Sequence, residues 1–223
     1  MKNGYQFTIE PNDDGREYEK KLRELKRLVE SDSIKEALNW RAPQISAICF
    51  PAHLYYPIMV LEDKDTLPLK MQPLNMNVDS EIRFVHDLQA AHDSGELLRD
   101  LYLLRNAANK SKGLGFALAG NFYPDFLLWL VDRDSGQQWL SLIDPKGIRQ
   151  MDLSDPKFGL ADEVKRLQRE LKLDICLNSF ILSVTARRDL LNVADWTDED
   201  FRARHILFMD DEDYLPSLFS LML

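Results

Sequence analysis

One stretch in the middle of the chain constrains the fold more than any other. Residues 121–147 contain two apolar runs, at 126–131 and 139–143, separated by the polar segment 132–136 with the sequence Asp-Arg-Asp-Ser-Gly. Aspartate, serine and glycine favour tight turns, so this pattern predicts two antiparallel strands joined by a short loop. Because both runs are almost continuously apolar, the strands of this hairpin are expected to be covered on both faces.

The elements around the hairpin predict a mixed α/β fold. We expect a helix from Asp79 or Ser80, a second helical piece at about 95–106, a short strand at 113–118, an amphipathic helix at 160–172 and a buried strand at 174–185. Over residues 80–185 the main elements then follow the order helix, strand, strand, strand, helix, strand. A strand at 205–209 and a short apolar helix follow towards the C-terminus.

The N-terminal part is expected to form an accessory region. Residues 16–30 place Tyr18, Leu22, Leu25 and Val29 on one face of an amphipathic helix. Short strands are expected within 44–61, and a loop over 62–78. We therefore divide the chain into an accessory or docking region at 1–75, a core at 76–190 and a C-terminal extension at 191–223 that packs on the core.

Composition limits the class of protein. A chain of 223 residues suits one large domain or a core with an added subdomain, and 45% hydrophobic residues can bury a sizeable core. We expect neither a transmembrane segment nor a signal peptide. The two cysteines, Cys49 and Cys176, lie far apart, and the four histidines form no metal-binding pair. A cytoplasmic protein without a zinc site is the expectation.

The net charge of −9 argues against an extended basic surface for nucleic acid. The charge is uneven, however. Residues 101–150 contain six basic and four acidic side chains, whereas the segments before and after them are both net acidic. Arg105, Lys110 and Lys112 lie in this basic stretch and could contact phosphates or remain in a solvated loop. For Arg187 and Arg188, contact with DNA and pairing with the acidic tail stay open.

Pairing geometry brings two carboxylates together on the hairpin. In an antiparallel hairpin, residues equally distant from the middle of the turn lie opposite each other. The midpoint between Asp125 and Asp144 falls between Asp134 and Ser135, in the middle of the predicted turn. The two carboxylates are thus expected within one residue of direct opposition, with Cβ atoms about 5 Å apart. Lys146 follows Asp144 by two residues and leaves the same face of its strand.

This arrangement predicts a metal site. Opposed carboxylates beside an apolar core repel each other, and a divalent cation between them removes the repulsion. Mg²⁺ accepts hard oxygen ligands, which Asp125, Asp144 and the backbone carbonyl of Pro145 could supply. Lys146 would then face a phosphate or an attacking water. The alternative is structural: Asp-Pro-Lys-Gly at 144–147 could be the exit of a strand into a turn, with Lys146 solvated.

The same residues resemble a known family of enzymes. Pro124-Asp125 followed by Asp144-Pro145-Lys146, in the order described above, is similar to the PD-(D/E)XK nuclease superfamily. Residues 50–190 look like the C-terminal endonuclease region of DEAD/DEAH helicases related to the restriction subunit of type III restriction–modification enzymes. The segments that carry this likeness are 84–88, 103–106, 115–116, 121–126, Trp129, 143–147 and 179–183.

The resemblance implies a restriction-endonuclease-like αβββαβ core with a mixed sheet and additions at both ends. It implies a Mg²⁺-dependent DNA endonuclease, with Mn²⁺ as a substitute, in which Asp125 and Asp144 bind the metal and Lys146 assists catalysis. It also implies Glu81 as a further ligand, although an acid in the first turn of a helix is equally explained by the helix dipole.

The sequence departs from the family in two respects. It lacks the G-x-x-x-x-G-K-[ST] loop of an ATP-driven motor, and it has Asp144 where the commoner residue is glutamate, a change that the superfamily tolerates. A helicase motor is therefore expected in cis or in trans, in restriction or phage defence, and a homo-oligomer is compatible with this picture. Two other functions stay open: a non-catalytic interaction module with a nuclease fold in a larger helicase or defence complex, and a phosphohydrolase acting on RNA.

Overall fold

The computed structural model describes residues 6–31, 33, 40–54, 57–61, 67–72, 75–76, 78–95, 97, 99–106 and 122–223. The chain divides into two compact units, residues 1–82 and residues 83–223. Each unit has strands and helices, so the chain belongs to the mixed α/β class, as the sequence predicted. The boundaries expected from the sequence at 75/76 and 190/191 stay predictions of domain organisation.

The first unit combines one long helix with short strands. Its elements are β1 (Gln6–Ile9), α1 (Asp13–Glu30), β2 (Arg41–Ala42), β3 (Ile45–Ile48), β4 (Ile58–Leu61), β5 (Leu69–Gln72) and β6 (Asn75–Met76). Strands β1 and β5 pair antiparallel, and a second sheet has the order β2-β3-β4-β6. The loop expected over 62–78 is therefore wrong in part, because β5 and β6 lie within it; β5 finds its pairing partner in β1, far away in sequence.

The amphipathic helix of the first unit is confirmed. The side chain of Asn12 caps α1 by accepting a hydrogen bond of 2.7 Å from the amide of Gly15. Tyr18 and Leu25 are buried in the core of this unit, with Leu22 and Val29 packed against it. Through this apolar face α1 packs against strands β3 and β4, whose side chains belong to the same core.

Among its described residues, the second unit is built on a five-stranded sheet. Helix α3 (Asp79–Asp93) begins in the first unit and continues into the second. The strands are β7 (Asp100–Arg105), β8 (Phe126–Val131), β9 (Gln138–Lys146), β10 (Cys176–Ser183) and β11 (Ile206–Phe208), in the order β11-β10-β9-β8-β7. Pairs β7/β8 and β8/β9 are antiparallel, whereas β9/β10 and β10/β11 are parallel, so the sheet is mixed.

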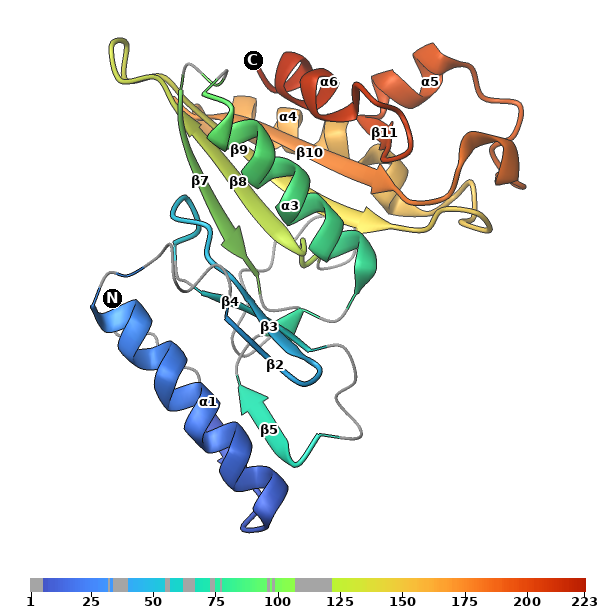
Figure 1. Ribbon diagram of the computed structural model, residues 1–223. Coiled ribbons are helices and arrows are strands. Elements are labelled where there is room, and N and C mark those ends of the chain that lie inside the picture. Colours follow the sequence, from blue (N-terminus) through green and yellow to red (C-terminus); the bar gives the residue numbers. More distant parts are fainter. Residues whose placement is uncertain are drawn as a thin grey trace. The chain divides into compact units, whose positions relative to one another are not determined.

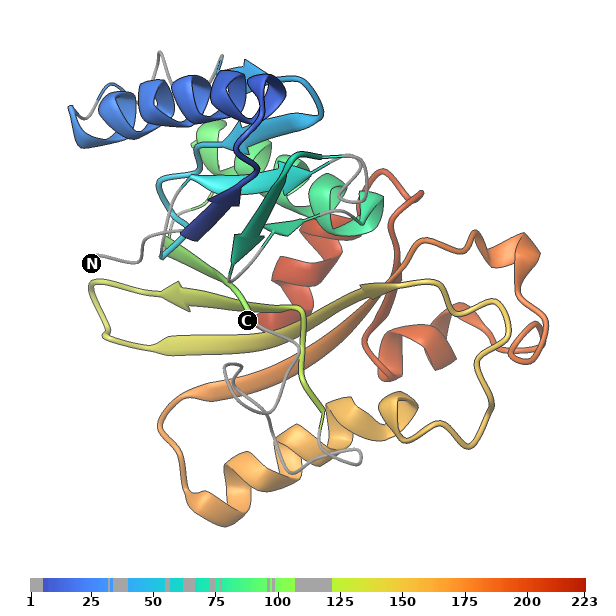
Figure 2. The ribbon, with the colours of Figure 1, turned by 90° about the horizontal axis from the view of Figure 1, so that it is seen from below.

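Helices cover both faces of this sheet, which explains why the central strand β8 is apolar on both of its faces (Figures 1 and 2). Helix α4 (Leu160–Leu171) connects β9 to β10 and packs on one face, where Leu160 and Val164 meet Leu127 and Leu142. On the other face, α3 packs through Phe84, whose ring centroid lies 5.3 Å from that of Phe126. Helix α6 (Tyr214–Met222) covers the same face.

The C-terminal region completes the second unit. After β10 it contains the 3₁₀ turn η2 (Arg187–Asp189) and the short helix α5 (Asp198–Ala203), whereas the 3₁₀ turn η1 (Pro156–Gly159) lies earlier, between β9 and α4. The hydroxyl of Tyr214 donates a hydrogen bond of 2.6 Å to Oδ2 of Asp87, so α6 is held to α3. Arg187 pairs with Asp198 and lies over the rings of Phe201 and Phe208, so this arginine is engaged within the C-terminal region.

The order α3-β7-β8-β9-α4-β10 agrees with the predicted order. Its first strand, however, is formed by residues 100–105, whereas the sequence predicted that strand at 113–118. The helical piece predicted at 95–106 is wrong: residues 100–105 form β7, in which Leu101 and Leu103 are buried and Tyr102 is exposed. A short apolar run fits either a helix or a strand, and pairing with β8 decides for the strand. The strand predicted at 113–118 lies outside the described residues.

Candidate active site

The register of the hairpin agrees with the midpoint that the turn predicted. Strands β8 and β9 pair in the register Phe126 opposite Ile143 through Val131 opposite Gln138. The pairing ends at Phe126 and Ile143, so Asp125 directly precedes the first paired residue of β8, and Asp144 directly follows the partner of that residue on β9. The backbone at Asp125 is held by the edge strand as well, because its carbonyl accepts a hydrogen bond of 2.8 Å from the amide of Asn106.

The turn that sets this register has a defined structure. The side chain of Asp132 accepts hydrogen bonds of 3.0 Å from the amides of both Asp134 and Ser135. The amide of Gly136 donates to the carbonyl of Asp132, and Gly136 adopts a φ of 73°, a conformation that favours glycine. The local sequence therefore fixes the loop length, and through it the residues that face each other at the far end of the hairpin.

The candidate residues share the face of the sheet that α4 covers. Leu140 and Leu142 of β9 pack towards α4, and side chains alternate along a strand, so Asp144 and Lys146 continue on that face. Leu127 of β8 also packs there, and Asp125 precedes it by two residues. The structure thus brings Asp125, Asp144 and Lys146 to one face, where the apolar packing under α4 ends.

Asp144 is almost completely buried and has a partner that the sequence did not predict. Its side chain is 9% exposed, and its Oδ2 accepts a hydrogen bond of 2.7 Å from the ammonium group of Lys157, in the turn η1. Burial by itself would lower the pKa of Lys157. The hydrogen bond and the charge of Asp144 outweigh that effect and raise the pKa, so this lysine is held in its charged form.

Asp125 also lies beside a cation. Nη1 of Arg105, at the end of β7, is 3.4 Å from Oδ1 of Asp125 and donates to the Asp125 carbonyl oxygen at 3.1 Å. The side chain of Arg105 is 11% exposed, and its guanidinium lies over the ring of Phe126. The contact of Arg105 with a phosphate stays a prediction from the sequence, and in the structure this arginine contacts Asp125.

Lys146 lies close to the carboxylate of Asp144 and to the ammonium group of Lys157. Burial lowers its pKa, the positive charge of Lys157 lowers it further, and the charge of Asp144 acts in the opposite direction. The positive charges of Lys146 and Lys157 repel each other, whereas Asp144 attracts both. Lys146 is therefore part of the cluster around Asp144, which argues against the simple interpretation of a solvated lysine at the exit of a strand.

The backbone carbonyl of Pro145 and the side chain of Glu81 were also predicted as metal ligands from the sequence. Pro145 lies opposite Leu182 of β10, and its carbonyl stays a predicted oxygen ligand. Glu81 is buried in the first turn of α3 and belongs to the first unit, whereas Asp125 and Asp144 belong to the second. A role for Glu81 as a further ligand stays a prediction from the resemblance. Lys110 and Lys112 lie outside the described residues.

The donor set suits a hard divalent cation. No group of three His, Cys, Asp or Glu side chains that could hold a metal occurs among the described residues. The candidate site instead offers two carboxylates at opposed positions, to which a backbone carbonyl and water molecules could add oxygen ligands. The carboxylate of Asp144 already holds the positively charged ammonium group of Lys157 at hydrogen-bonding distance. The residues therefore fit Mg²⁺ or Mn²⁺.

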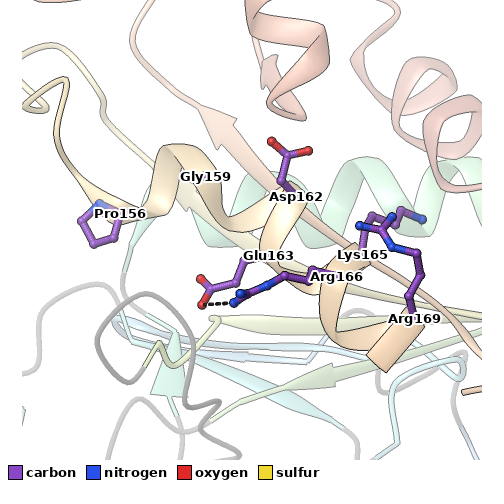
Figure 3. Close-up of a pocket in the computed structure, with 7 residues that line it drawn as sticks. All are labelled: Pro156, Gly159, Asp162, Glu163, Lys165, Arg166 and Arg169. Atoms are coloured by element: carbon purple, nitrogen blue, oxygen red, sulfur yellow. Dashed lines mark ion pairs between the residues drawn. The ribbon is translucent and has the colours of Figure 1, made fainter. Parts of the chain in front are cut away.

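A separate hollow of about 540 Å³ lies along α4 (Figure 3). Its lining includes the basic side chains Lys165, Arg166 and Arg169, but Arg166 lies 3.8 Å from Glu163 and 3.9 Å from Glu170. The acidic partners balance much of the positive charge, and neither aspartate of the candidate site lines this hollow. It therefore offers no clear phosphate site of its own.

Comparisons with family models, with curated proteins and with solved structures found no match to this chain. Within the described ranges, every helix is too short or too polar to cross a lipid bilayer. The assignment of a function therefore depends on the chemistry of the site.

Proposed function

We propose that this chain is a metal-dependent endonuclease that hydrolyses phosphodiester bonds in DNA. The observation that supports the proposal is the register of the hairpin, which pairs Phe126 with Ile143, the residues next to Asp125 and Asp144. Lys146 follows Asp144 by two residues on β9. Two carboxylates and a lysine at the end of an apolar cluster form a set that can bind a divalent cation beside a phosphate.

Each residue has a separate part in this proposal. Asp125 and Asp144 would hold Mg²⁺, or Mn²⁺ in its place, with the Pro145 carbonyl as a further ligand. When bound, the cation supplies a Lewis acid that polarises the phosphate and lowers the pKa of water. Lys146 places a positively charged group where negative charge develops during the attack on phosphorus. Arg105 keeps the Asp125 carboxylate oriented through the contacts described above.

The element order supports a restriction-endonuclease-like core. Helix α3, the antiparallel strands β7, β8 and β9, helix α4 and the parallel strand β10 follow each other as the resemblance implies. On that basis we assign the nuclease core to residues 76–190 and propose a DEAD/DEAH-type helicase motor, in cis or in trans, as its partner. A setting in restriction or phage defence rests on the same resemblance.

The experiment that tests this function compares substrates and metals. The full chain is incubated with supercoiled plasmid, linear duplex DNA, single-stranded DNA and RNA, each with Mg²⁺, with Mn²⁺ and with a chelator. Nicking or cutting of DNA that requires a divalent cation supports the proposal. Cleavage of RNA but not of DNA would favour the alternative function, a phosphohydrolase that acts on RNA. Cleavage that continues unchanged in the presence of a chelator would contradict a metal-dependent site.

A non-catalytic module is the second candidate, and one observation favours it. Each carboxylate already lies beside a cation of the chain itself, Asp125 beside Arg105 and Asp144 beside Lys157. Such pairs could serve structure alone. Calorimetry with Mn²⁺ in the presence of DNA separates the two functions, because a structural module predicts no heat of metal binding.

A further inference from the structure

Lys157 contacts Asp144, and the position of this lysine is set by its own backbone turn. Asp155 caps this turn: its Oδ1 accepts a hydrogen bond of 2.9 Å from the amide of Lys157. Pro156 occupies the first position, where a helical turn needs no amide hydrogen. The turn η1 thus presents the Lys157 side chain from a fixed point outside the hairpin.

The side chain is held along its length as well. The ammonium group of Lys157 lies 5.0 Å from the centre of the Phe122 ring, and its Nζ donates to Oδ2 of Asp144 at 2.7 Å. The side chain of Lys157 is 27% exposed, so water reaches it from one side. An ammonium group that is anchored by a ring and a carboxylate but open to water can leave the carboxylate without unfolding the sheet.

We propose that Lys157 is an internal counter-ion of the dicarboxylate, which a divalent cation must displace from Asp144 in order to bind. This inference rests on the proposed metal-dependent function. In the absence of metal, the ammonium group neutralises a buried carboxylate that would otherwise carry a large desolvation cost. When a divalent cation binds, the same lysine is released beside the site, where its charge is available to a phosphate oxygen of the substrate.

Competition between Lys157 and the metal has a measurable consequence. The free energy of the Lys157–Asp144 contact opposes metal binding, so its removal strengthens metal binding and weakens the metal-free fold. The expected change is on the order of tenfold in the dissociation constant, as for one good ion pair. A residue that acted only on structure would lower stability and would not tighten metal binding.

The test is calorimetric titration of the full chain with Mn²⁺ in the absence of DNA, which needs no enzymatic activity. The variants are Lys157→Met, which keeps the length of the side chain without its charge, and Lys157→Arg, which keeps the charge. Lys165→Met is the matched control, because Lys165 is a partly buried lysine on α4 outside the site. Lys157→Gln replaces Lys157→Met if the latter does not fold, and melting temperatures are recorded with and without Mn²⁺.

The expected result is Mn²⁺ binding about tenfold tighter in Lys157→Met, with Lys157→Arg and Lys165→Met close to the parent protein. The metal-free melting temperature of Lys157→Met should fall, and added Mn²⁺ should raise it by more than in the parent. Equal or weaker Mn²⁺ binding in Lys157→Met overturns the counter-ion proposal alone. Absence of Mn²⁺ binding in both proteins contradicts the metal-dependent function itself.

Discussion

The ammonium group of Lys157 donates a hydrogen bond of 2.7 Å to the buried carboxylate of Asp144. Both residues belong to an Asp-Pro-Lys triplet, at 144–146 and at 155–157. In the first triplet the aspartate stands on strand β9 among apolar neighbours. In the second, the aspartate caps a 3₁₀ turn and the lysine reaches back to the first. The same three residues thus play different parts because their backbone conformations differ.

Arg105 should act through Asp125. Arg105 lies 3.4 Å from the Asp125 carboxylate, a longer contact than the 2.7 Å between Lys157 and Asp144, and it also donates to the Asp125 carbonyl oxygen at 3.1 Å. Replacement of Arg105 by methionine therefore mainly removes the orientation of the ligand, and we expect about tenfold weaker Mn²⁺ binding. Lys at this position keeps the charge but not the forked geometry, so Arg105→Lys should recover only part of the affinity. Calorimetry with Mn²⁺ measures both variants. Unchanged affinity in Arg105→Met would show that this arginine serves the fold alone.

The turn of the hairpin should be sensitive to a single methyl group. Gly136 has a φ of 73° with nothing within 4 Å of an added Cβ, so the cost of Gly136→Ala comes from the backbone conformation, at about 1 kcal/mol. Gly159 also has open space around it, but its φ is −96°. Gly159→Ala is therefore the control and should be neutral or slightly stabilising. Urea denaturation compares the two, and equal effects would contradict the assignment of strain.

The hydrogen bond between Tyr214 of α6 and Asp87 of α3 should contribute measurably to stability. Tyr214→Phe removes the hydroxyl that donates to Asp87, and we expect a loss of about 1–2 kcal/mol in the free energy of unfolding. Tyr102→Phe is the control, since Tyr102 is 40% exposed on β7. Equilibrium unfolding in urea gives both values. A loss in Tyr102→Phe as large as that in Tyr214→Phe would argue against a specific role for this bond.

His205 should make stability depend on pH. Burial lowers its pKa below 6.5, the charge of Lys165 lowers it further, and the bond to the Ser179 carbonyl and the charge of Asp162 oppose the shift. Because the unfolded state then binds the proton more tightly, this contribution to stability is complete above pH 6.5 and is lost as the pH falls towards the folded pKa.

The comparison variant for this pH effect is His205→Asn, since His205 has a φ of 53° and asparagine tolerates that conformation. The difference in unfolding free energy between pH 8 and pH 5 should be smaller in the variant than in the parent. Equal differences in the two proteins would show that His205 does not contribute.

The register of the hairpin could be predicted because it depends on local information alone. The turn residues 132–136 fix its midpoint, and opposition of Asp125 and Asp144 follows from counting. The contact of Lys157 could not be derived in the same way, because it depends on the path of the chain from β9 into η1. The repeated Asp-Pro-Lys triplet was a signal, although nothing in the sequence shows which lysine lies on which aspartate.

The first strand of the core was missed for a physical reason. Residues 100–105 contain three leucines, which suit a helix as well as a strand, and only the partner strand β8 decides. The partner of Asp125 was missed with it, since Arg105 closes that strand. Long amphipathic patterns, such as Tyr18, Leu25 and their neighbours in α1, were correctly predicted because one helical face carries the whole signal.

Metal-dependent nicking of supercoiled plasmid by site variants of the full chain tests whether Asp144 and Lys146 belong to a catalytic site. Asp144→Asn and Lys146→Met remove a ligand and a charge with little change in size, and each should lower the rate with Mg²⁺ by about 100-fold or more. Asp162→Asn, on the exposed side of α4, is the matched control and should cut at the parent rate. Folding of all variants is checked by circular dichroism. Mg²⁺-dependent cleavage at the parent rate in both Asp144→Asn and Lys146→Met would contradict the assignment of this site.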